Sequence, residues 1–161
     1  MVRAESLSVG AIQSASFEIR EGEIVGIAAI EGNGQRDLLR AIGGLDQVGE
    51  TLRVAGPVAF VPEDRTTEGL IPEFSLAENV LLGMVDGADR WLDWSALRAR
   101  TATLLAEFDV RSGGPDTAAS SLSGGNQQKL LFARAFERAP RVLVAEDPTR
   151  GLDILATHEI H

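Results

Sequence analysis

The chain has 161 residues, of which 44% are hydrophobic and 24% charged, and these proportions are ordinary for one globular domain. Its net charge of −9 argues against a nucleic-acid partner, because a protein that follows phosphates needs a basic face. The chain lacks cysteine, which excludes disulfides and fits a reducing compartment, and no apolar run reaches the roughly 20 residues of a membrane helix.

The first third of the chain predicts strands, a glycine-rich loop and a helix. Residues 2–9 and 16–20 alternate as strands do. Residues 23–30, EIVGIAAI, are almost continuously apolar, which predicts a buried central strand. A loop over residues 31–34 leads into an amphipathic helix that stops at Gly43-Gly44.

This strand, loop and helix stand where a phosphate-binding loop, G-x-x-x-x-G-K-[ST], would lie. Gln35 takes the lysine position and brings no charge, and Arg36 takes the hydroxyl position, where it can add positive charge but no Mg²⁺ ligand. Glu31 adds a repulsive negative charge. The loop is therefore predicted to be degenerate, with weak phosphate binding and complete loss of binding both left open. The eight positions read Ala29-Ile30-Glu31-Gly32-Asn33-Gly34-Gln35-Arg36.

The middle of the chain predicts two short strands, over residues 51–54 and 58–61, and then helices. Ser75 and Glu78 have the spacing of a capping box, and Ser95 is predicted to open a second helix. Trp91 and Trp94 lie in this helical region, where packing in a core or at its rim is favoured over contact with a partner.

The last third carries the most specific residues. Ser123 can cap a helix whose first glycines leave backbone N–H groups open to an anion. An apolar strand over residues 142–145 ends in Glu146 and Asp147, and paired carboxylates at a strand end suit Mg²⁺ binding and water activation.

These two segments, in this order, resemble the ATP-binding cassette (ABC) ATPases. LSGGNQQK, residues 122–129, is similar to the signature motif of bacterial sugar and nucleoside importers, and VLVAEDPTRGLD, residues 142–153, to a Walker B strand and D-loop. The resemblance implies an α/β fold: an ABC-type P-loop core with an N-terminal antiparallel β portion and an inserted helical subdomain. The core would comprise residues 1–71 and 122–161, and the helical subdomain about 72–121.

The resemblance also implies ATP and Mg²⁺ as ligands and a role for each motif residue. The chain's own nucleotide would contact Gly32, Asn33, Gly34, Gln35, Arg36 and Asp37. The nucleotide of a second cassette would contact the signature residues Ser123, Gly124, Gly125 and Gln127. Glu146 stands at the metal position, Asp147 and Glu63 at the catalytic positions, and Asp153 in the D-loop.

Glu146 and Asp147 occur in the reverse of the usual order, Asp then Glu. The shorter Asp147 would then stand at the base position, which favours slow or absent hydrolysis at this chain's own site.

The implied function is that of an importer ATPase domain that lends its signature motif to a partner cassette with an intact P-loop, fused or separate. It would sit in the cytoplasm, attached to the inner face of the membrane through permease subunits without inserting directly. A non-catalytic dimerisation or regulatory module is the alternative. The sequence stops soon after Asp153, so we expect a C-terminally truncated cassette that lacks its last strands. The neighbours of the missing strand would then expose apolar faces.

Overall fold

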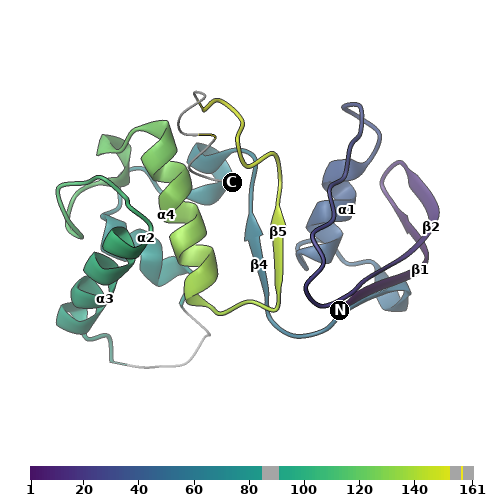
Figure 1. Ribbon diagram of the computed structural model, residues 1–161, viewed down its shortest axis with the longest axis horizontal. Coiled ribbons are helices and arrows are strands. Elements are labelled where there is room, and N and C mark those ends of the chain that lie inside the picture. Colours follow the sequence, from purple (N-terminus) through teal and green to yellow (C-terminus); the bar gives the residue numbers. More distant parts are fainter. Residues whose placement is uncertain (85–90, 153–156, 158–161) are drawn as a thin grey trace. The chain divides into compact units, whose positions relative to one another are not determined.

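The computed structural model of the chain describes residues 1–84, 91–152 and 157 (Figure 1). Its contacts divide the chain into two compact units. Unit 1 comprises residues 1–60 and 139–146, and unit 2 comprises residues 61–138 and 147–161. The boundaries expected at about residues 72 and 121 are not those of the contact-based units, and the expected subdomain stays a prediction.

Unit 1 is built on a three-stranded antiparallel sheet with the order β2-β1-β3. The strands are β1 (Val2–Val9), β2 (Ile12–Ile19) and β3 (Leu52–Val54), and a 3₁₀ turn, η1 (Gly49–Thr51), precedes the last. In the register, Val2 of β1 lies opposite both Ile19 and Val54. The predicted N-terminal antiparallel β portion is confirmed, and its second strand begins four residues earlier than expected.

Helix α1 (Gln35–Ile42) supplies the rest of the core of unit 1, together with β5 (Val142–Ala145). Strands β4 (Val58–Val61) and β5 pair in a second sheet (Figure 1). Val2 and Ala4 point to the core because successive side chains of a strand face opposite sides, and Leu7 joins them beyond a register shift between Ala4 and Leu7. The buried cluster consists of Val2, Ala4, Leu7, Leu38, Ile42 and Val144.

The prediction of a buried central strand over residues 23–30 is wrong for this structure. No residue of the run is in a strand, and all are exposed, with Ile24 at 100% and Ile30 at 78% of full exposure. A strand needs a neighbour to pair its backbone groups, and the described residues place none beside this run.

Unit 2 is helical, and helices α2 (Leu76–Leu82), α3 (Trp94–Glu107) and α4 (Gly124–Glu137) contact one another (Figure 1). Two short turns precede helices of this unit: η2 (Arg65–Gly69) lies before α2, and η3 (Ala119–Ser121) lies between α3 and α4. The amide of fully buried Asn79 bonds to the backbone of Ile71, Phe74 and Ser75, which fixes the chain that enters α2. None of the described helices is long and apolar enough to span a membrane.

The N-terminal caps of α2 and α3 were both predicted from local sequence, and one of the two predictions is correct. The capping box of Ser75 and Glu78 is confirmed in both directions. Helix α3 is capped by Asp93 and not by Ser95, because the Asp93 carboxylate accepts from the backbone N–H groups of Ser95 and Ala96.

The expectation that both tryptophans pack in a core or at its rim is wrong for Trp91. That side chain is fully exposed. Trp94 is 43% exposed, and the Arg98 guanidinium lies 5.8 Å from the centre of its ring, a cation–π arrangement at the surface.

Candidate functional site

The tip of α4 is a polar, accessible helix start. Ser123 is exposed, and its hydroxyl oxygen accepts from the backbone N–H of Asn126 at 3.5 Å and from the Asn126 side-chain amide at 2.9 Å. Gly124 and Gly125 follow, half-buried and without side chains. The predicted cap is confirmed, and the first turn presents backbone N–H groups at the positive end of a 14-residue helix.

The Ser123 hydroxyl has a defined polarity in this arrangement. A hydroxyl has two acceptor positions and one donor. Both acceptor positions face Asn126 donors, so the proton is left to donate away from the helix. An oxygen of an anionic ligand is the partner that such a donor and the helix dipole both favour.

Further residues of the signature segment are half-buried or buried and hold this tip in place. The Gln127 amide donates to the Ala119 carbonyl at 3.2 Å. Gln128 and Lys129 are buried, and Lys129 reaches Asp109 at the end of α3. The expected ligand contact of Gln127 remains a prediction, since the amide is engaged in holding the preceding turn.

The glycine-rich loop of unit 1 has the backbone shape that its glycines permit. Gly32 and Gly34 have φ of 89° and 86°, in the left-handed region, and Gly34 is the N-cap of α1. A Cβ at Gly34 would lie 3.0 Å from the Ile12 side chain and 3.2 Å from its backbone nitrogen. The chain therefore retains the tight turn into the helix, and Asn33 lies between the two glycines.

The remaining loop residues have other contacts. The Oε1 of Gln35 is buried and has no hydrogen-bond partner among the described residues. The Asp37 side chain lies against Gly10 in the turn between β1 and β2 and leaves no room for a side chain there. Arg36, in the second position of α1, reaches Glu146 beyond the end of β5, with 3.3 Å between Nε and Oε1.

The two expected carboxylates have different surroundings. Glu146 is 4% exposed and paired with Arg36, while Asp147 is exposed and has a left-handed backbone with φ of 37°. Left-handed conformation is unusual for residues other than glycine, although aspartate tolerates it better than most. The two neighbouring acids therefore differ in exposure and in backbone conformation.

Mg²⁺ does not fit the arrangement around Glu146. The ion prefers an octahedron of oxygen ligands, whereas a guanidinium offers only N–H donors. The Arg36 guanidinium occupies the Glu146 carboxylate in this structure, and Glu146 as a metal ligand remains a prediction.

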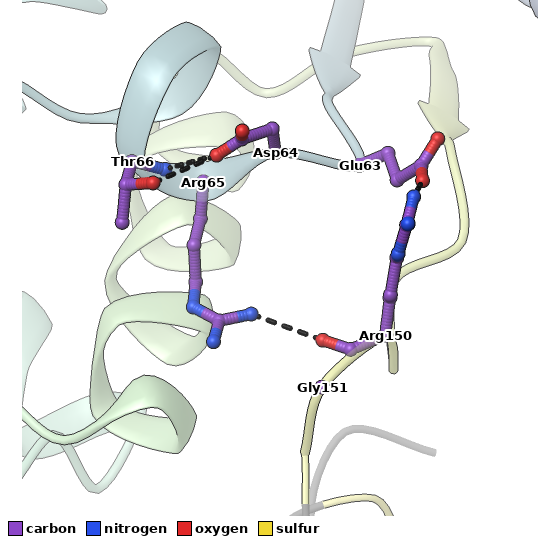
Figure 2. A pocket seen from close by; sticks show the side chains of 6 residues that line it. All are labelled: Glu63, Asp64, Arg65, Thr66, Arg150 and Gly151. Carbon is purple, nitrogen blue, oxygen red and sulfur yellow. Dashed lines mark hydrogen bonds and ion pairs between the residues drawn. The ribbon is translucent and has the colours of Figure 1, made fainter.

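A pocket of about 330 Å³ opens in unit 2, and Figure 2 shows Arg65 and Arg150 lining two sides of it. Glu63, the expected catalytic residue of the Q-loop position, forms an ion pair with Arg150. Nη1 of Arg65 donates to the Arg150 carbonyl at 3.0 Å, and a Cβ at Gly124 would lie 2.9 Å from Nη2. The segments at 63–65 and 150–151 are therefore joined by two bonds, beside the tip of α4.

Asp64 fixes the local geometry that aims Arg65 into the pocket. Its carboxylate accepts from the Thr66 hydroxyl and from the backbone N–H groups of Thr66 and Thr67. These bonds, led by that from Thr66, hold the pKa of Asp64 well below its usual range. The sequence carries one local signal for this arrangement, because Asp64 and Thr66 have the spacing of a side-chain turn.

The expected site residues lie in both units of the fold. The loop residues 32–37 and Glu146 belong to unit 1. Glu63, the signature residues and Asp147 belong to unit 2. Asp153 of the expected D-loop lies outside the described residues.

Comparison with known proteins agrees with this arrangement of motifs. Residues 12–150 match the family model described as ABC transporter. The nucleoside import ATP-binding protein NupA of Lactococcus lactis subsp. cremoris is 40% identical, over 93% of this chain and 33% of NupA. The ribose import ATP-binding protein RbsA of Lacticaseibacillus paracasei is 37% identical, over 94% of this chain and 34% of RbsA.

Among solved structures, the dimeric ATP-binding cassette MJ0796 in a post-hydrolysis state, bound to ADP and Pi, has a TM-score of 0.83 at 24% identity. The match covers 99% of this chain and 79% of that one. This likeness shows the fold, which confirms the predicted α/β cassette. The chain belongs to the ABC transporter family. It spans about a third of the length of the curated relatives it matches.

Proposed function

We propose that this chain is the ATP-binding domain of an importer for sugars or nucleosides and that its signature tip completes the ATP site of a partner cassette. Relatives named as nucleoside and ribose import proteins support the transport class. The partner would carry an intact P-loop, either fused to this chain or as a separate subunit, and both would act at the inner face of the membrane through permease subunits.

The observation that carries the proposal is the contrast between two helix starts. The tip of α4 is exposed and presents Ser123, Gly124 and Gly125, which suit the γ-phosphate of ATP. At the start of α1 the lysine position holds Gln35 and the hydroxyl position holds Arg36. The two helix starts would therefore have different roles. The start of α4 would contact the ATP of the partner cassette, while the site at the start of α1 would bind ATP weakly and hydrolyse it slowly.

The test uses ATP turnover by this chain mixed with a cassette that has an intact G-x-x-x-x-G-K-[ST] loop. We expect Ser123→Arg to lower turnover by at least about a hundredfold, since a long cation would block the approach of the γ-phosphate and remove an aligned donor. The matched control is Ser120→Arg, which adds the same side chain at an exposed serine three residues earlier.

Two results would count against the proposal. Turnover that is unchanged by Ser123→Arg, in a mixture that still forms the pair, would favour the non-catalytic dimerisation or regulatory module. Micromolar affinity of the isolated chain for MgATP would contradict the weak own site.

A further inference from the structure

The last residue of the chain's own phosphate loop, Arg36, places a positively charged side chain against the carboxylate of Glu146. Arg36 lies in the first turn of α1 and Glu146 directly after β5, two elements of the same compact unit. Their contact, 3.3 Å between Nε and Oε1, joins residues 110 positions apart in the sequence.

Glu146 needs such a partner. Its side chain is 6% exposed, and a carboxylate buried to that extent is costly unless an opposite charge or several hydrogen bonds compensate it. Arg36 remains 49% exposed, so its stem lies at the surface while its guanidinium reaches the buried acid. The pair thus fixes a positive charge between the loop and the strand end.

In a complete phosphate loop this region belongs to Mg²⁺, which a serine or threonine hydroxyl binds from the helix side. Here the residue at the hydroxyl position brings the charge itself and occupies the carboxylate at the strand end. Guanidinium is always charged, and its five N–H donors suit phosphate oxygens. One edge of the Arg36 guanidinium can pair with Glu146 while the other edge donates to a phosphate oxygen.

We propose that Arg36 takes the place of the divalent cation, so that this chain's own site binds nucleoside di- and triphosphates without Mg²⁺. This inference uses the proposed function only in treating residues 29–36 as a phosphate loop. It concerns how that loop is charged, independently of the signature tip.

The experiment measures binding of the fluorescent nucleotide TNP-ATP to the full chain, in Mg²⁺ and in EDTA. Because the natural loop binds weakly, Gln35→Lys first restores the lysine and keeps Arg36. Its affinity is expected to be the same with and without Mg²⁺, within about twofold. Adding Arg36→Ser restores the hydroxyl and removes the internal cation, and we expect binding at least about tenfold tighter in Mg²⁺ than in EDTA.

The double variant Gln35→Lys/Arg36→Lys is the matched control, because it keeps the charge and supplies no hydroxyl. It should remain independent of Mg²⁺, and thermal unfolding of each variant checks that it is folded. Binding by the double serine variant alone, and only in Mg²⁺, would overturn the proposal, because Arg36 would then have supported no binding.

Equal Mg²⁺ dependence of Gln35→Lys and the double serine variant would overturn the proposal, as would failure of every folded variant to bind. Neither result would bear on the signature tip, since the Ser123→Arg measurement concerns the partner's nucleotide.

Discussion

The ammonium of Lys129 lies 3.1 Å from the Asp109 carboxylate and 3.1 Å from the backbone carbonyl of the same residue. Lys129 is the last residue of the signature segment, and its side chain is 9% exposed. Asp109 has a left-handed backbone with φ of 47° just after α3. The buried lysine therefore ties the first half of α4 to the end of α3.

Lys129→Met tests this tie. Methionine keeps most of the apolar stem but leaves the Asp109 carbonyl and carboxylate without their donor. We expect a lower midpoint of thermal unfolding, with a smaller loss at high salt than at low salt because the ion pair is partly screened. Thermal melts followed by circular dichroism at two salt concentrations measure this, and an unchanged midpoint at both would show that the contact does not stabilise the fold.

Asp109 also gives a pH-dependent prediction. The hydrogen bond from Lys129 lowers the pKa of Asp109 below its value of 3.8 in an unfolded chain. A depressed pKa contributes stability above the unfolded value, and that contribution is lost as the pH falls through the folded pKa. Asp109→Asn should therefore be less stable than the natural chain near neutral pH and equally stable in strong acid.

Asparagine is the suitable replacement in this measurement because it also tolerates the left-handed backbone, so the charge alone changes. Urea unfolding of both chains from acid to neutral pH gives the difference in free energy. A difference that stays constant across this range would assign the loss to packing and not to ionisation.

Asn79→Ala should be strongly destabilising. The buried amide satisfies both the N–H and the carbonyl of Ile71 and also reaches the carbonyls of Phe74 and Ser75. Leaving buried backbone groups unpaired costs about 1–3 kcal/mol, and we expect the free energy of unfolding in urea to fall by about 3 kcal/mol. Ser75→Ala, which removes only the cap of the same helix, should cost about 1 kcal/mol.

Ile24→Glu should leave stability within about 0.5 kcal/mol, because a fully exposed side chain loses no packing on replacement. The contrast is Leu130→Ala in α4, at a side chain with no exposure, which should cost about 2–5 kcal/mol. A large loss from Ile24→Glu would show that residues 23–30 are buried after all.

The parts predicted well from sequence are those decided over a few residues. Ser75 and Ser123 cap their helices as their spacing indicates, and β5 has the predicted bounds, residues 142–145. Asp93 was missed as the cap of α3 because Ser95 is also a good capping residue two positions later.

The features that the sequence did not predict depend on contacts between residues far apart in the chain. Residues 23–30 have the composition of a strand, but composition does not supply the neighbour that a strand must pair with. The contact of Arg36 with Glu146, and that of Arg65 with the Arg150 carbonyl, bridge 110 and 85 positions. No local pattern connects such residues. The G-x-x-x-x-G-K-[ST] pattern identifies Arg36 as the residue at the hydroxyl position, but it does not predict that Arg36 contacts Glu146.

Nη2 of Arg65 lies near two glycines, because an added Cβ would come within 2.9 Å of it at Gly124 and 3.7 Å at Gly151. Nη1 of the same guanidinium donates to the carbonyl of Arg150. One guanidinium thus serves two segments. A side chain larger than glycine at position 124 would meet Arg65, and loss of Arg65 would remove the bond that holds the Arg150 carbonyl.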